Sequence, residues 1–308
     1  MNYTRFGNTG LKVSRLCLGT AFRETRDEAV ATNTIEYAVD QGINFIDCAN
    51  FYGRGWAETV LGKAIKGHRD DLVITSKVHS PMGESPNDRG SSAYHIMREI
   101  ERSLKRLQTD HIDLYLLHSW DQETPLDETL RALDSLVNQG KVRYIGCCNF
   151  AAWQICKGLW TSDRLNLTPF LGIQHHYNLL HRSLEYEHFA LAEGEGLGLM
   201  TYSPIAVGLL LGRQPKEKPV QKAIFEGPNV TNVLATVNEI GKETGKTAAQ
   251  VSIAWVLSHP QISSAMTGPD SPEQLKENLG GVQWELGEEE CQRLNDVSAW
   301  AIGNGVIR

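Results

Sequence analysis

Three apolar runs in the sequence each end at an ionisable residue. The run INFID ends at Asp47, LVITSK ends at Lys77 and LYLLH ends at His118, while Tyr52 follows Asp47 by five residues. A buried cation beside an anion is costly unless each serves the other, so this set indicates a reactive site. Lys77, paired with Asp47, is expected to favour the phenolate of Tyr52 and to lower the pKa of that phenol from about 10 toward working pH.

The chemistry that these residue types indicate is proton transfer to or from oxygen. Tyr52 could give a proton to a carbonyl oxygen or take one from an alcohol, and His118 could orient that oxygen by a hydrogen bond. Such a site supplies a proton but no hydride. Carbonyl reduction therefore requires a nicotinamide cofactor bound beside it.

Later runs carry groups that suit such a cofactor. Asn149 and Gln174 offer the donors and acceptors that a carboxamide needs, and Tyr202 offers a flat ring for stacking. The loop YSPIAVGLL (202–210) includes Gly208, and GPDSPEQLKENL (268–279) predicts a helix whose N-terminus can bind phosphate. We therefore expect the cofactor along the ends of the later strands.

The elements that must position these residues repeat eight times as a short apolar run followed by a segment with helical periodicity. The runs are apolar on successive residues, which is typical of strands covered on both faces in a parallel sheet. The expected strands are residues 16–19, 43–48, 72–78, 112–118, 143–148, 170–174, 198–202 and 262–267. With no linker or composition break, the sequence predicts one α/β domain, residues 1–308, folded as a (β/α)8 TIM barrel whose strand ends share one mouth.

Several flanking segments have expected roles in this barrel. Residues 3–13, YTRFGNTGLKV, predict an N-terminal β-hairpin that closes the bottom of the barrel. Helices are expected from an N-cap at Ser92 to residue 107, and from about 125 to a left-handed Gly140. The irregular segments 80–90 and 214–231 are expected on the rim of the site, where each could fold over a ligand.

Composition excludes several classes of protein. The chain of 308 residues is 41% hydrophobic and 22% charged, which is ordinary for a folded protein. A net charge of −7 argues against nucleic acid or an anionic membrane as partner, and no apolar run reaches the roughly 20 residues that cross a bilayer. We expect a soluble, cytoplasmic protein. Six cysteines without metal-ligand spacing are interpreted as reduced core thiols.

The chain resembles the aldo-keto reductase superfamily over nearly its whole length. The motifs that carry this resemblance are FGNTGLKVSRLCLGT (6–20), GINFIDCANFYGRGWAETVLGKAI (42–65), LVITSKV (72–78), SLKRLQTDHIDLYLLHSWD (103–121), GKVRYIGCCNF (140–150), YSPIAVGLL and GPDSPEQLKENL. The resemblance implies a catalytic tetrad of Asp47, Tyr52, Lys77 and His118. It also implies reduction of aldehydes and ketones, usually with NADPH and without a metal.

The same resemblance implies a set of cofactor contacts along the strand ends. The nicotinamide contacts fall on Asn149, Gln174 and Tyr202. The pyrophosphate lies along residues 203–209, and the adenosine end meets residues 268–278. The expected cofactor-binding residues are Gly19, Thr20, Asp47, Asn149, Gln174, Tyr202, Ser203, Pro204, Ala206, Gly208, Leu209, Gly268, Gln274, Glu277 and Asn278.

Two positions depart from the family pattern. Cys148 stands where relatives commonly have Ser, and a thiol is a weaker hydrogen-bond partner. Asp270 stands near the place where many NADPH users have a basic or hydroxylated residue. Its carboxylate would repel a 2′-phosphate that it faced, and could instead accept from a free ribose hydroxyl. NADP(H) is the expected cofactor, NAD(H) is the alternative, and Lys276 is a candidate for the missing positive charge.

Two other function classes stay open at this point. The resemblance extends to potassium-channel β subunits, which serve chiefly as cofactor-sensing partners of another protein. A metal-dependent barrel hydrolase would use His118, His175, His176 and Asp47 as ligands, but adjacent residues 175 and 176 should point to opposite faces of a strand. For the expected carbonyl or alcohol substrate, Phe22, Trp56 and Trp120 could form an apolar pocket. No residue pattern specifies an oligomeric state.

Overall fold

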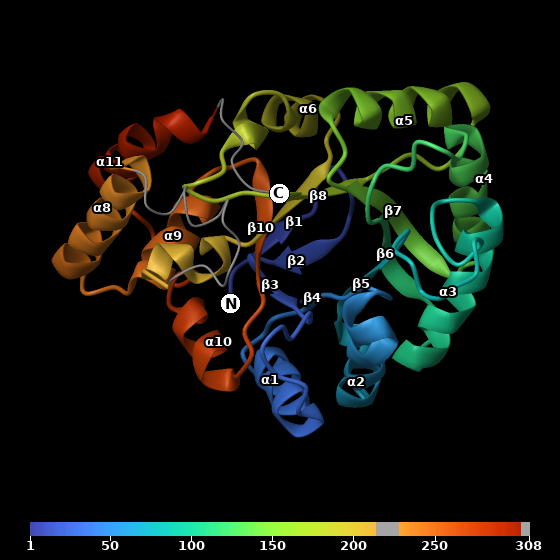
Figure 1. The fold of residues 1–308 in the computed structure, drawn as a ribbon, viewed down its shortest axis with the longest axis horizontal. Helices are drawn as coiled ribbons and strands as arrows, with labels where there is room; N and C mark the ends of the chain where they lie inside the picture. Colours follow the sequence, from blue (N-terminus) through green and yellow to red (C-terminus); the bar gives the residue numbers. More distant parts are fainter. Residues whose placement is uncertain (214–227, 303–308) are drawn as a thin grey trace.

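A closed barrel of parallel strands surrounded by helices forms the body of the molecule (Figure 1), in a computed structural model that describes residues 1–213 and 228–302. The strands pair in the order β10-β3-β4-β5-β6-β7-β8-β9, so the first and last barrel strands close the sheet. The predicted (β/α)8 barrel is therefore confirmed. Of the predicted rim segment 214–231, residues 214–227 lie outside the described residues.

The barrel strands follow one another with a helix after most of them. The strands are β3 (Leu16–Gly19), β4 (Phe45–Asp47), β5 (Val73–Val78), β6 (Ile112–Leu117), β7 (Val142–Cys148), β8 (Gly172–His176), β9 (Gly198–Tyr202) and β10 (Ile262–Thr267). The helices are α1 (Glu28–Asp40), α2 (Trp56–Ala64), α3 (Ala93–Leu107), α4 (Leu126–Asn138), α5 (Ala152–Leu165), α6 (His188–Gly194), α8 (Pro228–Thr244), α9 (Ala248–Leu257), α10 (Pro272–Leu279) and α11 (Glu288–Ser298). Short 3-10 turns are η1 (Tyr52–Gly55), η2 (Arg69–Asp71), η3 (Ser183–Glu185), η4 (Ala206–Leu211) and η5 (Ala299–Ala301).

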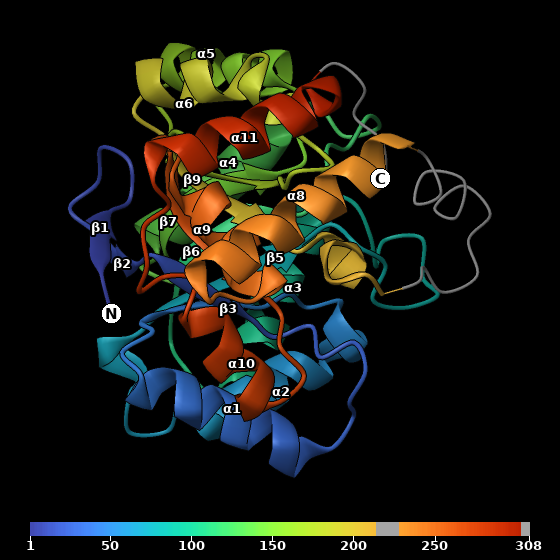
Figure 2. The same ribbon diagram turned by 90° about the vertical axis from the view of Figure 1, so that its left-hand side faces the viewer.

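An antiparallel hairpin of β1 (Tyr3–Arg5) and β2 (Lys12–Ser14) lies at one end of the barrel (Figure 2). Phe6, in the turn of the hairpin, is fully buried and packs edge-on against Phe45 of β4 with ring centroids 5.6 Å apart. A Cβ at Gly198 would lie 2.4 Å from the Phe6 ring, so glycine makes room for it. The predicted hairpin thus closes the bottom of the barrel.

Two helices confirm the start and stop signals read from the sequence. Ser92 caps α3 by accepting a hydrogen bond from the backbone of His95 at 3.2 Å, and Ile96 and Ile100 of this helix are fully buried. After α4, Gly140 has the expected left-handed backbone with φ of 73°. The helix signals read from the sequence therefore locate elements that pack around the barrel strands.

Some predictions at the edges of elements are wrong. The second barrel strand begins at Phe45 rather than residue 43, because the N–H of Ile43 bonds to the carbonyl of Ala38 at the end of α1 and is not free for the strand ladder. The cysteines at 17, 48, 147 and 148 are buried free thiols as expected, but Cys156 is exposed on α5 and Cys291 is partly exposed. Among the described residues, no helix combines the length and the apolar character needed to cross a membrane.

Candidate active site

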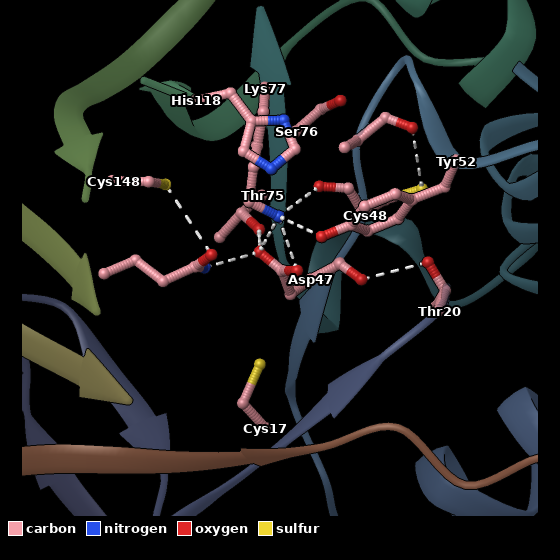
Figure 3. A network of polar contacts seen from close by, with 12 residues as sticks. Cys17, Thr20, Asp47, Cys48, Tyr52, Thr75, Ser76, Lys77, His118 and Cys148 are labelled. Atoms are coloured by element: carbon pink, nitrogen blue, oxygen red, sulfur yellow. Dashed lines mark hydrogen bonds and ion pairs between the residues drawn. The ribbon is translucent and has the colours of Figure 1, made fainter. Parts of the chain in front are cut away.

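A buried ion pair stands at the centre of the site. Asp47 ends β4 and Lys77 lies on the adjacent β5, and both side chains are fully buried. The Lys77 Nζ donates to the two Asp47 carboxylate oxygens at 2.7 and 2.6 Å and to the Cys48 carbonyl at 2.8 Å (Figure 3). Asp47 also accepts from Thr75 Oγ1 at 2.6 Å and from Gln174 Nε2 at 2.9 Å. The dense bonding offsets the cost of burying two charges.

Tyr52 completes the contacts of this ammonium. Lys77 Nζ donates to the Tyr52 hydroxyl at 3.3 Å and lies 4.9 Å from the centre of its ring. Tyr52 begins the turn η1, in which Gly53, Arg54 and Gly55 have φ of 59°, 54° and 93°. A left-handed conformation at a residue such as Arg54 costs about 1–3 kcal/mol and persists only where the surroundings hold it. The chain therefore maintains a strained turn directly beside this phenol.

The predicted lowering of the Tyr52 pKa is wrong. Burial raises the pKa of Tyr52 to about 12, because the phenolate would lose its hydration, and this outweighs the opposing charge of Lys77. Asp47 also raises it, since its carboxylate neutralises much of the ammonium that was expected to favour the phenolate. Burial would lower the pKa of Lys77, but Asp47 and Tyr52 raise it above its ordinary value. The pair is therefore a protonated phenol beside a firmly charged ammonium.

His118 follows β6 and meets the edge of this phenol. The rings of His118 and Tyr52 pack edge-on with centroids 5.9 Å apart. Burial lowers the pKa of His118 to about 3, and the Lys77 charge acts in the same direction. The imidazole is therefore neutral. Its Nδ1 is buried and has no hydrogen-bond partner among the described residues, which leaves hydrogen-bonding capacity in the ring unused.

The amide groups predicted from the later strands lie beside the same centre. Gln174 on β8 donates to Asp47, and Cys148 Sγ contacts Gln174 Oε1 at 3.6 Å. Asn149, with a left-handed φ of 59°, accepts from the Tyr202 hydroxyl at 2.9 Å. One face of the Tyr202 ring stacks on His176, with centroids 5.2 Å apart and an angle of 15°. The amides are thus fixed in orientation by protein partners.

A cavity of about 470 Å³ runs along the carboxyl ends of the strands. Asp47, Tyr52 and His118 line it, whereas Lys77 is not among the described lining residues. The expected cofactor-binding residues that line it are Gly19, Asp47, Asn149, Gln174, Tyr202, Ser203, Pro204, Gly208, Gly268, Gln274, Glu277 and Asn278. Three others, Thr20, Ala206 and Leu209, are buried nearby but are not among the described lining residues. Thr20 instead donates to the Asp47 carbonyl at 2.9 Å.

The far end of the cavity contains Asp270, whose direction the sequence left open. Its Oδ1 accepts from the backbone N–H of Glu24 at 3.0 Å, so the carboxylate reaches the loop after β3. The Ser271 side chain caps α10. Lys276 is exposed and is not part of the described lining.

Two cations and one aromatic ring in the lining were missed by the sequence reasoning. Arg23, Phe51 and Arg213 all border the cavity. A signal was present, since each follows or precedes a motif residue on the same rim loop by only a few positions. Of the aromatic residues expected around a substrate, Phe22 lines the cavity, and the Trp56 ring packs against the Phe22 ring with centroids 6.0 Å apart. Trp120 packs against Phe150 and Trp153 instead.

A family model described as the aldo/keto reductase family matches residues 15–299. The chain belongs to this family. It is 39% identical over 312 residues to a Bacillus subtilis protein named "Uncharacterized oxidoreductase YrpG", with 96% of each chain covered. It is 33% identical over 316 residues to "Aldo-keto reductase YhdN" of the same organism, covering 96% and 93%. It is also 35% identical over 300 residues to a "Probable voltage-gated potassium channel subunit beta" of Arabidopsis thaliana, covering 92% and 91%.

The family resemblance read from the motifs is therefore confirmed, and it makes the chain an oxidoreductase of the aldo/keto reductase kind. The geometry bears on the metal alternative as well. Within the described ranges, no group of three or more His, Cys, Asp or Glu side chains could hold a metal ion. Asp47, one of the ligands that this alternative needs, is bonded to Lys77, Thr75 and Gln174.

Proposed function

We propose that this aldo/keto reductase reduces aldehydes or ketones with a nicotinamide cofactor, and that Tyr52 is the general acid. The observation that carries the proposal is the Tyr52 side chain on the wall of the cavity, with its hydroxyl 3.3 Å from the buried Lys77 ammonium. A group that must deliver a proton needs to hold it at working pH and to be stabilised after losing it. The raised pKa of Tyr52 meets the first need and Lys77 meets the second.

The residues present fit a nicotinamide dinucleotide. The amides of Asn149 and Gln174 are held in fixed orientations at the cavity wall, and the exposed side of Tyr202 offers a ring surface. The loop that begins at Ser203 and the N-terminus of α10 would bind the phosphates, because the positive end of a helix dipole favours anions. When bound, the cofactor supplies the hydride that the side chains lack.

Each member of the tetrad has a separate role in the proposed proton transfer. Tyr52 donates its proton to the substrate oxygen as negative charge develops there. Lys77 then stabilises the phenolate, and Asp47 keeps the ammonium charged and aimed at the hydroxyl. His118, which is neutral, donates a ring N–H to the same substrate oxygen and so fixes its position.

For the cofactor we propose NADP(H), with NAD(H) as the alternative. Asp270 is engaged with the backbone of Glu24, which fits a carboxylate turned toward the neighbouring loop. Arg23 and Arg213 border the cavity and could meet phosphate groups. Paired titrations of the protein with NADPH and NADH, followed by tryptophan fluorescence, measure this preference directly.

The test of the function is the substitution Tyr52→Phe. It removes one hydroxyl and should lower turnover by a factor on the order of 10² or more, while cofactor affinity stays near the native value. Tyr94→Phe is the matched control, because Tyr94 is 61% exposed on α3. A panel of aromatic aldehydes, sugars and ketosteroids supplies the substrate. Unchanged turnover in Tyr52→Phe would remove Tyr52 from the role of acid.

A second candidate function is supported by the plant relative named as a probable potassium-channel β subunit. In that role the chain would bind the cofactor and present its state to another protein. The two candidates differ in rate, because a sensor can retain its cofactor through very slow turnover. Steady turnover of any carbonyl in the panel favours the enzyme, whereas tight cofactor binding with at most one slow reduction per bound cofactor favours the sensor.

A further inference from the structure

A second group of buried charges lies behind the candidate site. Glu58 on α2 and Glu99 on α3 are both fully buried, and both bond to Arg106. The Arg106 Nε donates to Glu58 Oε2 at 2.6 Å, and its Nη2 donates to Glu99 Oε1 at 2.5 Å. None of the three belongs to the described lining of the cavity, and the proposed reaction does not use them.

This group bonds to the strand that carries Lys77. Ser76 precedes Lys77 on β5, and its hydroxyl donates to Glu58 Oε1 at 2.5 Å. Successive side chains of a strand point to opposite faces, so this hydrogen bond lies outside the barrel while Lys77 reaches inward. Figure 3 shows the two side chains leaving the strand in different directions. Glu58 thus contacts the reverse side of the strand that positions the ammonium.

The same group also packs against the segment that carries Tyr52. Glu58 belongs to α2, which begins directly after the η1 turn of Tyr52–Gly55. A Cβ at Gly55 would lie 2.6 Å from the Arg106 Cδ, so the arginine side chain packs on the backbone of that strained turn. One carboxylate therefore joins the strand of Lys77 to the segment of Tyr52.

Of the contacts that Lys77 makes, the one with the Tyr52 hydroxyl is the longest and would be the first to break if the two segments moved apart. Lys77 holds Asp47 and the Cys48 carbonyl at 2.6–2.8 Å, but the Tyr52 hydroxyl at 3.3 Å. A small movement of α2 away from β5 would lengthen this contact first. Misplacement of a reacting group by about 1 Å can lower a rate by about 10²-fold.

We propose that Glu58, held by Arg106, is a positioning residue that sets the distance between the Tyr52 hydroxyl and the Lys77 ammonium through its hydrogen bond with Ser76. The expected effect of Glu58 on turnover rests on the proposed role of Tyr52 as the acid. The effect of Glu58 on the location of the Tyr52 hydroxyl does not depend on that role.

The test compares two serines that bond to the same group of charges. Ser76→Ala removes the hydrogen bond to Glu58, and Ser103→Ala removes a contact of 3.2 Å to Arg106 from the α3 side. Both serines are fully buried, so the two substitutions are matched in size and burial. Fluorotyrosine-labelled protein gives a ¹⁹F resonance for Tyr52, assigned by its loss in Tyr52→Phe. Circular dichroism and thermal unfolding check the fold of each variant.

Ser76→Ala should shift the Tyr52 resonance and lower kcat on the order of tenfold, with cofactor Kd within about twofold of native. Ser103→Ala should leave the resonance and kcat unchanged. Ser76→Thr, which keeps the hydroxyl, should restore both. Glu58→Gln is a second variant, since it keeps an acceptor for Ser76 but weakens the hold of Arg106, and it should fall between native and Ser76→Ala.

Three outcomes would overturn the inference. These are an unchanged Tyr52 resonance in Ser76→Ala, an equal shift in Ser103→Ala, or an unchanged kcat in Ser76→Ala while Tyr52→Phe does lower turnover. Undiminished turnover in Tyr52→Phe overturns the proposed function instead. In that case the resonance of Ser76→Ala still decides whether Glu58 positions the phenol.

Discussion

Two groups of buried charges lie on the two sides of β5, and they differ in what their cation contacts. Inside the barrel, Lys77 bonds to Asp47 and to the Cys48 carbonyl, and it also contacts the Tyr52 hydroxyl. Outside the barrel, the Arg106 guanidinium donates hydrogen bonds to Glu58, Glu99 and Ser103, all of which belong to helices α2 and α3. Both groups are well bonded, so burial and pairing alone do not mark a reactive site.

The difference lies in the neighbour that can change its charge. Beside Lys77 is a phenol at the wall of a cavity, which can lose a proton during a reaction. Around Arg106 the partners are two carboxylates and a serine, enclosed between helices. The arrangement of Lys77 and Tyr52 therefore suits proton transfer, whereas the Arg106 group suits a structural role between the η1 turn and β5. Substitution of each cation by an apolar side chain tests this division.

Lys77→Met should have the largest effect on turnover. It removes the charge that stabilises the Tyr52 phenolate and leaves Asp47 without its cation, and turnover should fall on the order of 10³-fold. Initial rates under saturating cofactor measure this. Residual turnover within about tenfold of native would show that the ammonium does not stabilise the transition state.

Arg106→Met should act mainly on stability. Breaking a buried pair by removing one partner costs about 3–5 kcal/mol, because a charge is left uncompensated. Here Glu58 loses its arginine partner, whereas Glu99 keeps an ion pair with Arg102 at 3.3 Å. Urea unfolding gives the free energy of unfolding, and kcat per folded molecule should fall by only about tenfold through the shifted turn. Arg98→Met is the control, because Arg98 lies on α3 like Arg106 but is partly exposed and pairs with Asp88 in the preceding loop; it should cost about 1 kcal/mol or less. A kcat loss as large as that of Lys77→Met would break the division between the two groups.

The inner group was predictable from the sequence, and the outer group was not. Asp47, Lys77 and His118 each end an apolar run, and barrel topology alone brings the ends of neighbouring strands together. Glu58 and Arg106 are 48 residues apart on different helices, and no spacing rule pairs them. Their contact depends on how α2 packs against the end of α3.

The direction of the Tyr52 pKa also depended on details that sequence cannot supply. The neighbouring ammonium was predicted correctly, but the sequence does not show how fully the phenol is buried or how closely Asp47 cancels the charge of Lys77. The orientation of Asp270 toward Glu24 is a similar case, because it depends on the path of two rim loops. Residue types and spacing indicated which side chains meet, whereas the pKa of Tyr52 and the orientation of Asp270 depend on burial and distances that only the three-dimensional structure shows.

The pH dependence of the reaction should show the smallest effect and separates the two pictures of Tyr52. For reduction, the acid form is required, and a pKa of about 12 keeps Tyr52 protonated throughout the working range. His118, with a pKa of about 3, stays neutral, so the kcat of reduction should be flat from about pH 5 to pH 10. For alcohol oxidation the phenolate is required, and the rate should rise with pH over the same range. Both profiles are measured at saturating cofactor and substrate.

An oxidation rate that levels off near neutral pH would mean that Lys77 does lower the pKa of the phenol, as the sequence alone predicted. A fall in reduction rate centred near pH 6.5, the ordinary pKa of histidine, would mean that His118 titrates in the site.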